Sequence, residues 1–219
     1  MSTPRAVKSA GGRGIVLPRP RLGRGRSLEE ALRRRCTTRE IAARPLRPQQ
    51  LSNLLWAACG VNRRRGPFGL PGITAASASN SQEIEVFVAL EDGTYRFEAG
   101  RHRLAPVAAG DLRPLAIGRG QRDAVEMRAP VQLIYVADLR RLTHTQGFQE
   151  PGLHDPEVQK SYYYADTGLI AGNVYLFAAS RGLAAWFHNC DRPALTEALG
   201  LRADERVLFA QSVGYPARD

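Results

Sequence analysis

The chain has 219 residues and a mass of 24.0 kDa, and 43% of the residues are hydrophobic, so it can bury a sizeable core in one or two domains. Three cysteines without a CxxC pair argue against a disulfide framework and against a zinc or other metal site, and this count fits a reducing cytoplasm. No uninterrupted apolar stretch is long enough to span a bilayer, so we expect no membrane partner. The formal net charge of +10 indicates an anion or nucleic-acid partner until the position of the charge is considered.

Most of the surplus positive charge lies in the first 27 residues, which carry seven Lys or Arg and no acid. This stretch is rich in Gly, Pro and Arg, so we predict a flexible basic arm over residues 1–27 and one domain over residues 28–219. Such an arm could anchor the chain to nucleic acid or to acidic lipid. We favour a solubilising tail along a neighbouring subunit, because no aromatic residues for base stacking lie between the arginines.

Two helices are predicted after the arm. A serine followed by two acids and later by arginines predicts a helix from about Leu28 to Arg35. A proline at position 48 and a helical apolar repeat predict a second helix, which ends at Gly60. Glycine and proline punctuation then predicts a loop over residues 62–73.

Strand patterns dominate the middle of the chain. Large aliphatic residues occupy every second position over residues 83–90, as in a strand, and residues 95–97 and 103–107 flank a turn as in a hairpin. A continuous apolar run over residues 130–138 predicts a buried strand. Residues 206–215 predict a final strand.

Helical patterns return in the last third of the chain. Residues 161–182 carry apolar side chains on nearly every face, which predicts a long buried helix, and Asp191 caps a further helix through Leu199. The polar connection from His144 to His154 is either a functional lid that sets substrate choice or a plain surface connection. Since helices and strands are mixed without regular βαβ alternation, we expect an α+β fold with one mainly antiparallel sheet.

The motif RCTTR, from Arg35 to Arg39, is the first candidate site. On an extended segment Arg35, Thr37 and Arg39 point to one side, whereas Cys36 and Thr38 point to the other. Two guanidiniums and a hydroxyl suit a phosphate dianion together with a second anionic or polar group. A solvated basic helix end is the competing interpretation.

The stretch ASASNSQ, residues 76–82, is the second candidate. It is rich in hydroxyls and lies directly before a predicted strand, so Ser77, Ser79 and Asn80 could bind a ribityl chain or a flavin edge. No GxSxG, HExxH or Walker pattern is present. A thiol and base at His188 and Cys190 would lack an orienting third group, so we expect a buried structural cysteine there.

Together these stretches resemble the FMN-dependent nitroreductase superfamily, nearest the branch of azoline (thiazole/oxazole) dehydrogenases. RCTTR is similar to the family's R-x-S-x-R/K element, and TAASASNSQEIEVFVAL is similar to its T-A-P-S-A-x-N-x-Q strand entry. DTGLIAGNVYLFAASRGLA resembles its long central dimer helix, and the resemblance runs from about Leu17 to the C-terminus. It implies a nitroreductase-like α+β fold, with a mainly antiparallel central sheet flanked by helices and a long buried dimer helix.

The resemblance implies a homodimer with FMN at the interface. Arg35 would hold the phosphate with Thr37, Arg39 would face the pyrimidine edge, and the loop at residues 77–80 would contact the FMN of the partner subunit. The implied cofactor-binding residues are Arg35, Thr37, Arg39, Ser77, Ala78, Ser79, Asn80, Gln82, His188, Asn189 and Arg218. Asn189 stands where the family has a glycine, and Arg218 replaces its basic residue after GYP.

The implied activity is an oxidoreductase that passes hydride from NAD(P)H through flavin N5 to an electron-poor acceptor, such as a nitroaromatic, quinone or enone. No side chain need act as a nucleophile, and His188 is a candidate proton donor beside water and the tyrosines at 162–164. Two alternatives remain. One is a flavin dehydrogenase that oxidises an azoline-like or other modified substrate, and the other is a non-catalytic relative that binds nucleic acid through the basic arm.

Overall fold

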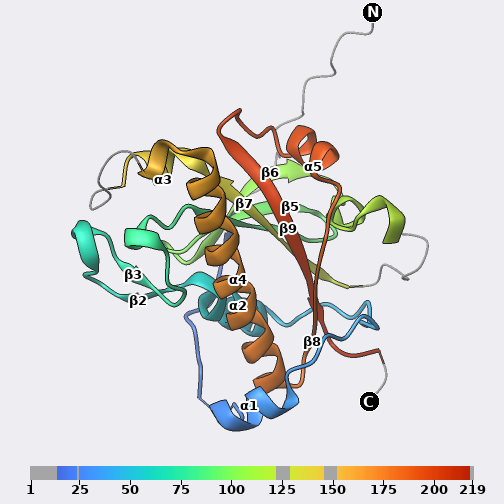
Figure 1. The fold of residues 1–219 in the computed structure, drawn as a ribbon. Coiled ribbons are helices and arrows are strands. Elements are labelled where there is room, and N and C mark those ends of the chain that lie inside the picture. Colours follow the sequence, from blue (N-terminus) through green and yellow to red (C-terminus); the bar gives the residue numbers. More distant parts are fainter. Residues whose placement is uncertain (1–13, 24, 122–128, 146–151, 218–219) are drawn as a thin grey trace, which may run out of the picture.

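The computed structural model of the chain describes residues 14–23, 25–121, 129–145 and 152–217 (Figure 1). Within these residues seven strands form one sheet in the order β1-β6-β5-β4-β7-β9-β8, and each neighbouring pair is antiparallel. The strands are β1 (Ile15–Val16), β4 (Ile84–Ala89), β5 (Gly93–Glu98), β6 (Arg103–Ala109), β7 (Val131–Asp138), β8 (Ala184–His188) and β9 (Glu205–Gly214). The prediction of an α+β fold with a mainly antiparallel sheet is confirmed.

Helices cover both faces of this sheet. The helices are α1 (Leu28–Arg34), α2 (Pro48–Cys59), α3 (Leu139–Thr143), α4 (Pro156–Arg181) and α5 (Arg192–Ala198). From β7, Leu133 and Tyr135 pack with α2 and α4, whereas Ile134 and Val136 pack with α5. Burial on both faces explains why β7 reads as a continuous apolar run.

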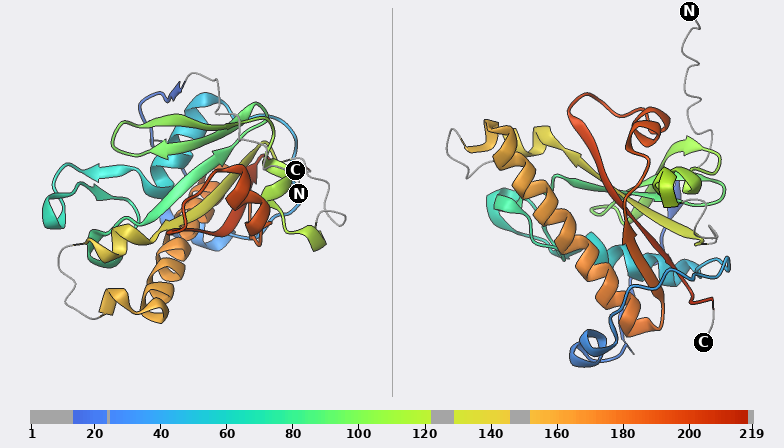
Figure 2. Two further views of the ribbon diagram at one scale, coloured as in Figure 1. Left: turned by 90° about the horizontal axis from the view of Figure 1, so that it is seen from above. Right: turned by 45° about the vertical axis from the view of Figure 1, so that its right-hand side comes forward.

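The helix ends follow the signals in the sequence. The Ser27 hydroxyl accepts the N–H of Glu30 at the start of α1, and Asp191 caps α5. The helix α4 ends at Gly182, whose φ of 65° is the left-handed conformation that glycine adopts without steric cost. In Figures 1 and 2, α4 runs as one long helix beside the sheet, with α1 at its C-terminal end.

The long helix differs from its prediction in two respects. It begins at Pro156 rather than near residue 161, because Asp155 caps it and a proline is favourable in the first turn. Only one side of it is buried within a single chain, and Leu169 on the other side is 48% exposed. No helix in the described part of the chain is long and apolar enough to cross a membrane.

The prediction of a loop over residues 62–73 is wrong at both ends of that stretch. Strand β2 (Val61–Arg63) pairs with β3 (Gly72–Ile73), so the glycines and prolines form the connection of a small hairpin. Strand β8 also went unpredicted, since its five residues carry no period-two signal. In β4 all six positions are buried rather than alternate ones, because both faces of the sheet are covered.

The segment before α1 is bound to the domain where the structure describes it. Strand β1 pairs with β6, and Leu17 is 6% exposed. The backbone N–H of Arg21 donates to Asn53 Oδ1 over 2.8 Å, and the N–H of Arg26 donates to the carbonyl of Ser180. The predicted flexible arm therefore does not extend over residues 14–23 and 25–27, and residues 1–13 lie outside the described residues.

Candidate functional site

The RCTTR segment leaves α1 as an extended strand-like piece beside β8. The N–H of Thr38 donates to the carbonyl of Ala185 over 3.0 Å. Thr37 Oγ1 lies 3.1 Å from Tyr175 Oη, and the Arg35 guanidinium carbon lies 5.6 Å from the centre of the same tyrosine ring. Arg35 and Thr37 therefore share one side, as the alternation of an extended chain predicts.

Arg39 does not join them. Its guanidinium carbon lies 5.6 Å from the ring centre of Trp186. Trp186 lies between Ala185 and Phe187 in β8, and those two neighbours pack on the face that carries α4. Since successive strand residues point to opposite faces, Arg39 contacts a ring on the other face of β8. The prediction that all three side chains point to one side is wrong for Arg39, whose guanidinium lies over Trp186 and not over Tyr175.

Tyr175 connects this segment to β8 through its hydroxyl. Its oxygen accepts the backbone N–H of Phe187 over 2.8 Å. Because the oxygen already accepts, the phenolic hydrogen is available for Thr37, and the Thr37 hydroxyl can then donate outward. Each donor in this row polarises the next one. The row therefore ends in an exposed hydroxyl beside the Arg35 guanidinium, an arrangement that suits an anion.

Within the residues that the structure describes, acidic side chains compensate only part of the positive charge in and before this segment. Arg34 donates to Glu30 Oε1 over 2.8 Å, which compensates its charge. Among the described residues, no acidic side chain pairs with Arg35 or with Arg39, and both side chains are exposed. Two free guanidiniums and an outward hydroxyl fit the phosphate and polar ring edge of a cofactor such as FMN.

His188 is buried behind the segment. Its Nε2 lies 2.8 Å from Ser212 Oγ, and its ring centre lies 4.3 Å from that of Trp186. Burial lowers the pKa of His188 to about 4, so the ring is neutral near pH 7. A neutral, buried imidazole favours a structural role over proton donation. Asn189 is exposed and accepts the N–H of Gly118 over 3.0 Å, and Arg218 lies outside the described residues.

The second candidate stretch is strained. Three residues without the freedom of glycine adopt left-handed backbone conformations, Ser79 with a φ of 45°, Asn80 with 56° and Gln82 with 51°. Such conformations cost about 1–3 kcal/mol each and concentrate at functional sites. We call residues 77–82 the strained loop.

Polar side chains of the strained loop bind its backbone and the connection between β2 and β3. Ser77 Oγ accepts the N–H of Gln82 over 3.1 Å, and the Gln82 amide donates to the carbonyl of Pro71 over 2.6 Å. The Asn80 amide donates to the carbonyl of Pro67 over 3.2 Å. These three side chains therefore shape the loop, and the predicted direct contacts from them to a cofactor stay a prediction. Ser79 lines a pocket of about 400 Å³ with Phe68, Leu70, Arg141 and His144, among others.

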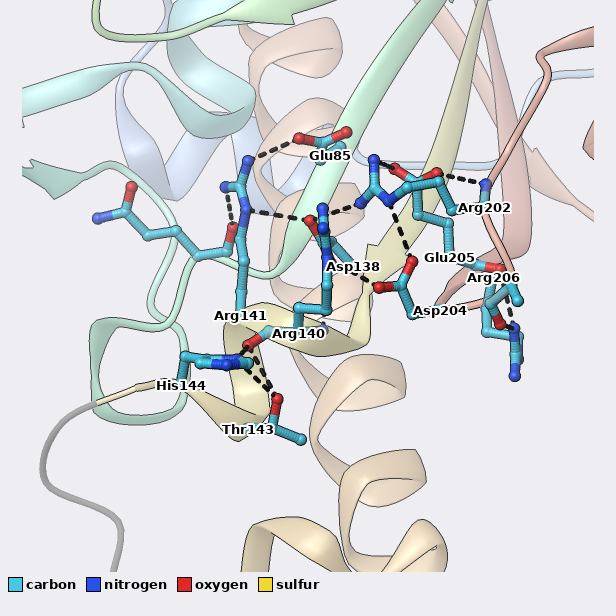
Figure 3. A network of polar contacts seen from close by, with 12 residues as sticks. Glu85, Asp138, Arg140, Arg141, Thr143, His144, Arg202, Asp204, Glu205 and Arg206 are labelled. Carbon is cyan, nitrogen blue, oxygen red and sulfur yellow. Dashed lines mark hydrogen bonds and ion pairs between the residues drawn. The ribbon is translucent and has the colours of Figure 1, made fainter.

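Three charged residues that the sequence analysis left unassigned support the loop. The N–H of Ala78 donates to Asp166 Oδ2 over 2.9 Å, and the Ser81 hydroxyl donates to Glu83 Oε2 over 2.6 Å. Arg141 donates to the carbonyl of Gln82 over 2.8 Å and to Glu85 Oε1 over 2.6 Å, and Figure 3 shows it between Glu85 and Asp138. An acid buried in an otherwise apolar helix, as at Asp166, is the signal that could have drawn attention to this support.

The two candidate stretches lie at different heights along α4. The RCTTR segment contacts Tyr175, and the strained loop contacts Asp166. Nine residues of helix separate these contacts, which is about 13 Å along the axis. The predicted lid from His144 to His154 lies in part outside the described residues, although His144 lines the Ser79 pocket. The structure thus contains two partial sites.

Comparisons with known proteins agree on one family. The family model described as "Nitroreductase family" matches residues 32–215. MJ1384, a candidate nitroreductase of Methanocaldococcus jannaschii, is 32% identical over 161 residues, covering 71% of this chain and 75% of that protein. The crystal structure of a candidate nitroreductase of Ralstonia eutropha JMP134 is 35% identical, with a TM-score of 0.82 and coverage of 100% of this chain and 97% of that chain.

A more distant likeness shows the fold alone. The NADPH:FMN oxidoreductase of Vibrio harveyi, solved in complex with NAD+, is 20% identical with a TM-score of 0.59. The match covers 87% of this chain and 69% of that one. The nitroreductase-like fold expected from the sequence is confirmed by these matches.

Proposed function

Because the chain belongs to the nitroreductase family, an oxidoreductase family, we propose that it is an FMN-dependent oxidoreductase. It works as a homodimer, takes reducing equivalents from NAD(P)H and delivers them to an electron-poor acceptor of nitroaromatic, quinone or enone type. The Vibrio harveyi protein of similar fold is an NADPH:FMN oxidoreductase solved with bound NAD+, which supports FMN and NAD(P)H as the two nucleotides of this proposal. The three cysteines of the present chain are free thiols, which agrees with the expected cytoplasmic location.

The row of donors from Phe187 through Tyr175 to Thr37 carries the proposal. It ends in a hydroxyl beside Arg35, which has no acidic partner among the described residues, and a phosphate dianion is the group that best satisfies both. When bound, FMN would supply the ring that accepts and releases hydride. Arg39 has the charge and reach to meet the polar edge of that ring, with Trp186 fixing its guanidinium.

Two copies are needed to complete the site. The helix positions that contact the RCTTR segment and the strained loop, Tyr175 and Asp166, lie about 13 Å apart along α4, so the two stretches do not adjoin within one chain. A two-fold axis would bring the loop of one subunit to the segment of the other. The apolar surface for this dimer contact would come from the exposed side of α4 and from α1. On α1, Leu28 is 61% exposed and Leu32 is 57% exposed.

His188 takes no part in proton transfer in this proposal. Its ring is neutral and its Nε2 contacts Ser212, so the proton for the acceptor comes from water. The residues of this chain bind and orient the cofactor, and they place the acceptor over it.

The direct experiment is an absorption spectrum of the purified protein, followed by release and identification of any flavin. We expect FMN near one per subunit, with NAD(P)H oxidation that depends on added acceptor. A second assay measures oxidation of an azoline-containing peptide. Activity in that assay would favour the alternative of a flavin dehydrogenase. A colourless protein that binds DNA with a steep salt dependence would contradict the proposal and favour the nucleic-acid alternative.

A further inference from the structure

Two buried carboxyl groups meet beneath the strained loop. Glu83 is 0% exposed and Asp166 is 5% exposed. Asp166 Oδ2 accepts the N–H of Ala78, and Glu83 Oε2 accepts the hydroxyl of Ser81. These bonds hold the loop on both sides of the left-handed residues Ser79 and Asn80.

The remaining oxygen of Glu83 lacks a donor. Glu83 Oε1 is buried, and no N–H or O–H of the described residues reaches it. Burial first, and then the charge of the Asp166 carboxyl, raise the pKa of Glu83. Two buried carboxylates in contact cannot both ionise without a large electrostatic penalty, whereas one proton between them supplies the missing donor.

Charged groups on the neighbouring elements do not neutralise this pair. On α3, Arg141 is bound to Glu85 of β4 over 2.6 Å. On β7, Asp138 is bound to Arg202 over 3.1 Å and also faces Arg140 (Figure 3). Within the described part of the chain, no guanidinium, ammonium or imidazolium forms an ion pair with Glu83 or Asp166.

We infer that Glu83 and Asp166 share one proton near neutral pH, and that this protonated pair positions the strained loop. Asp166 accepts from Ala78, while Glu83 donates its O–H to Asp166 and accepts from Ser81. When the proton is lost, the two negative charges repel, and the two bonds that hold the loop are loosened. The consequence for flavin retention rests on the proposed function, but the pair itself does not.

The direction of the pH effect follows from burial. Burial first, and then the charge of Asp166, raise the pKa of Glu83 from 4.5 to about 8. The folded chain therefore binds this proton more tightly than the unfolded chain does. Its contribution to stability is complete below the unfolded value and is lost as the pH rises through the folded value.

The test replaces Glu83→Gln, because a glutamine amide donates to Asp166 and its oxygen accepts from Ser81 at every pH. Between about pH 6.5 and about pH 9 we expect the wild-type Tm to fall by roughly 5 °C and the variant's Tm to stay level. Asp166→Asn is the second variant. Its amide donates to an ionised Glu83 and its oxygen still accepts from Ala78, so its Tm should fall less with rising pH than that of the wild type, with the part that burial causes remaining.

Glu85→Gln is the matched control, since it changes a buried acid two residues away that is already paired with Arg141. It should lower Tm at every pH and keep the slope of the wild type. Amide exchange of the 77–82 peptide reports on the loop itself. At about pH 9 we expect it to be at least about tenfold faster in the wild type than in Glu83→Gln. Parallel Tm profiles, or equal exchange rates, would overturn the inference.

These measurements use the purified protein whether or not it carries flavin, so the two proposals fail separately. A colourless protein whose wild-type and Glu83→Gln Tm profiles diverge with pH would contradict the proposed function and support the shared proton. A flavoprotein with parallel profiles does the opposite. If both hold, flavin release should also accelerate with rising pH in the wild type and stay constant in Glu83→Gln.

Discussion

Thr37 and Tyr175, 138 positions apart in the sequence, face each other with their hydroxyl oxygens 3.1 Å apart. This contact fixes the extended segment after α1 to the long helix α4. It also links the segment to β8, because Tyr175 accepts the N–H of Phe187. The candidate phosphate site therefore depends on three elements that only the tertiary fold brings together.

Removing the guanidiniums of Arg35 and Arg39 should strongly weaken flavin binding. In Arg35→Ala with Arg39→Ala, each lost charge-assisted bond costs about 1.5–3 kcal/mol, so the Kd for FMN rises by at least about a hundredfold. Fluorescence titration with FMN measures this. Arg33→Ala with Arg34→Ala is the control with the same loss of charge, and it should bind FMN as the wild type does. Equal weakening in both pairs would mean that general charge, and not this site, attracts the anion.

Tyr175→Phe tests the row of donors. The substitution keeps the ring under Arg35 but leaves the N–H of Phe187 without its acceptor, which lowers the free energy of unfolding by about 1–3 kcal/mol. Thr37 loses its partner as well, so FMN affinity should fall about tenfold. Urea unfolding and flavin titration measure the two effects. An unchanged affinity would show that Thr37 needs no support from Tyr175.

The backbone of the strained loop gives a prediction about residue 79. With a φ of 45°, Ser79→Val places a β-branched side chain in a left-handed conformation and should destabilise the fold by about 1–3 kcal/mol. Ser79→Gly removes the steric cost, although it adds freedom to the unfolded chain, so stability should stay within about 1 kcal/mol of the wild type. Thermal unfolding of both variants distinguishes backbone strain from a role of the hydroxyl. Equal losses in the two would favour the hydroxyl.

His188 should govern acid stability rather than activity. Since burial lowers its pKa to about 4, the unfolded chain takes up this proton more readily than the folded chain. The stability that depends on neutral His188 is complete above its unfolded pKa of 6.5 and is lost as the pH falls through the folded value. His188→Gln should therefore show a flatter stability profile between about pH 4 and about pH 6.5 in urea unfolding. A loss of activity near neutral pH without any change in this profile would instead assign His188 to catalysis.

Local signals in the sequence predicted the elements that have them. Ser27 and Asp191 are capping residues that predict the starts of their helices. The continuous apolar run of β7 predicts a buried strand, because helices cover both faces of the sheet. The short strands β2, β3 and β8 were missed because pairing partners, and not their own few residues, make them strands.

The sequence indicated candidate binding residues but not the residues that support them. Arg35, Thr37 and the strained loop carry recognisable motifs. Tyr175 and Asp166 are single polar residues within a helical pattern, and their roles depend on contacts more than 80 positions away in the sequence. The position of Arg39 over Trp186 was not predicted, because alternation along a segment does not show which ring of the neighbouring strand a long side chain reaches.

A crystal structure of the protein with FMN tests the central claim most directly. The account predicts a dimer in which the phosphate contacts Arg35 and Thr37 of one subunit, while the same flavin meets residues 77–82 of the other. FMN bound elsewhere, or Arg35 and Thr37 turned to bulk solvent in a flavin-loaded dimer, would contradict it.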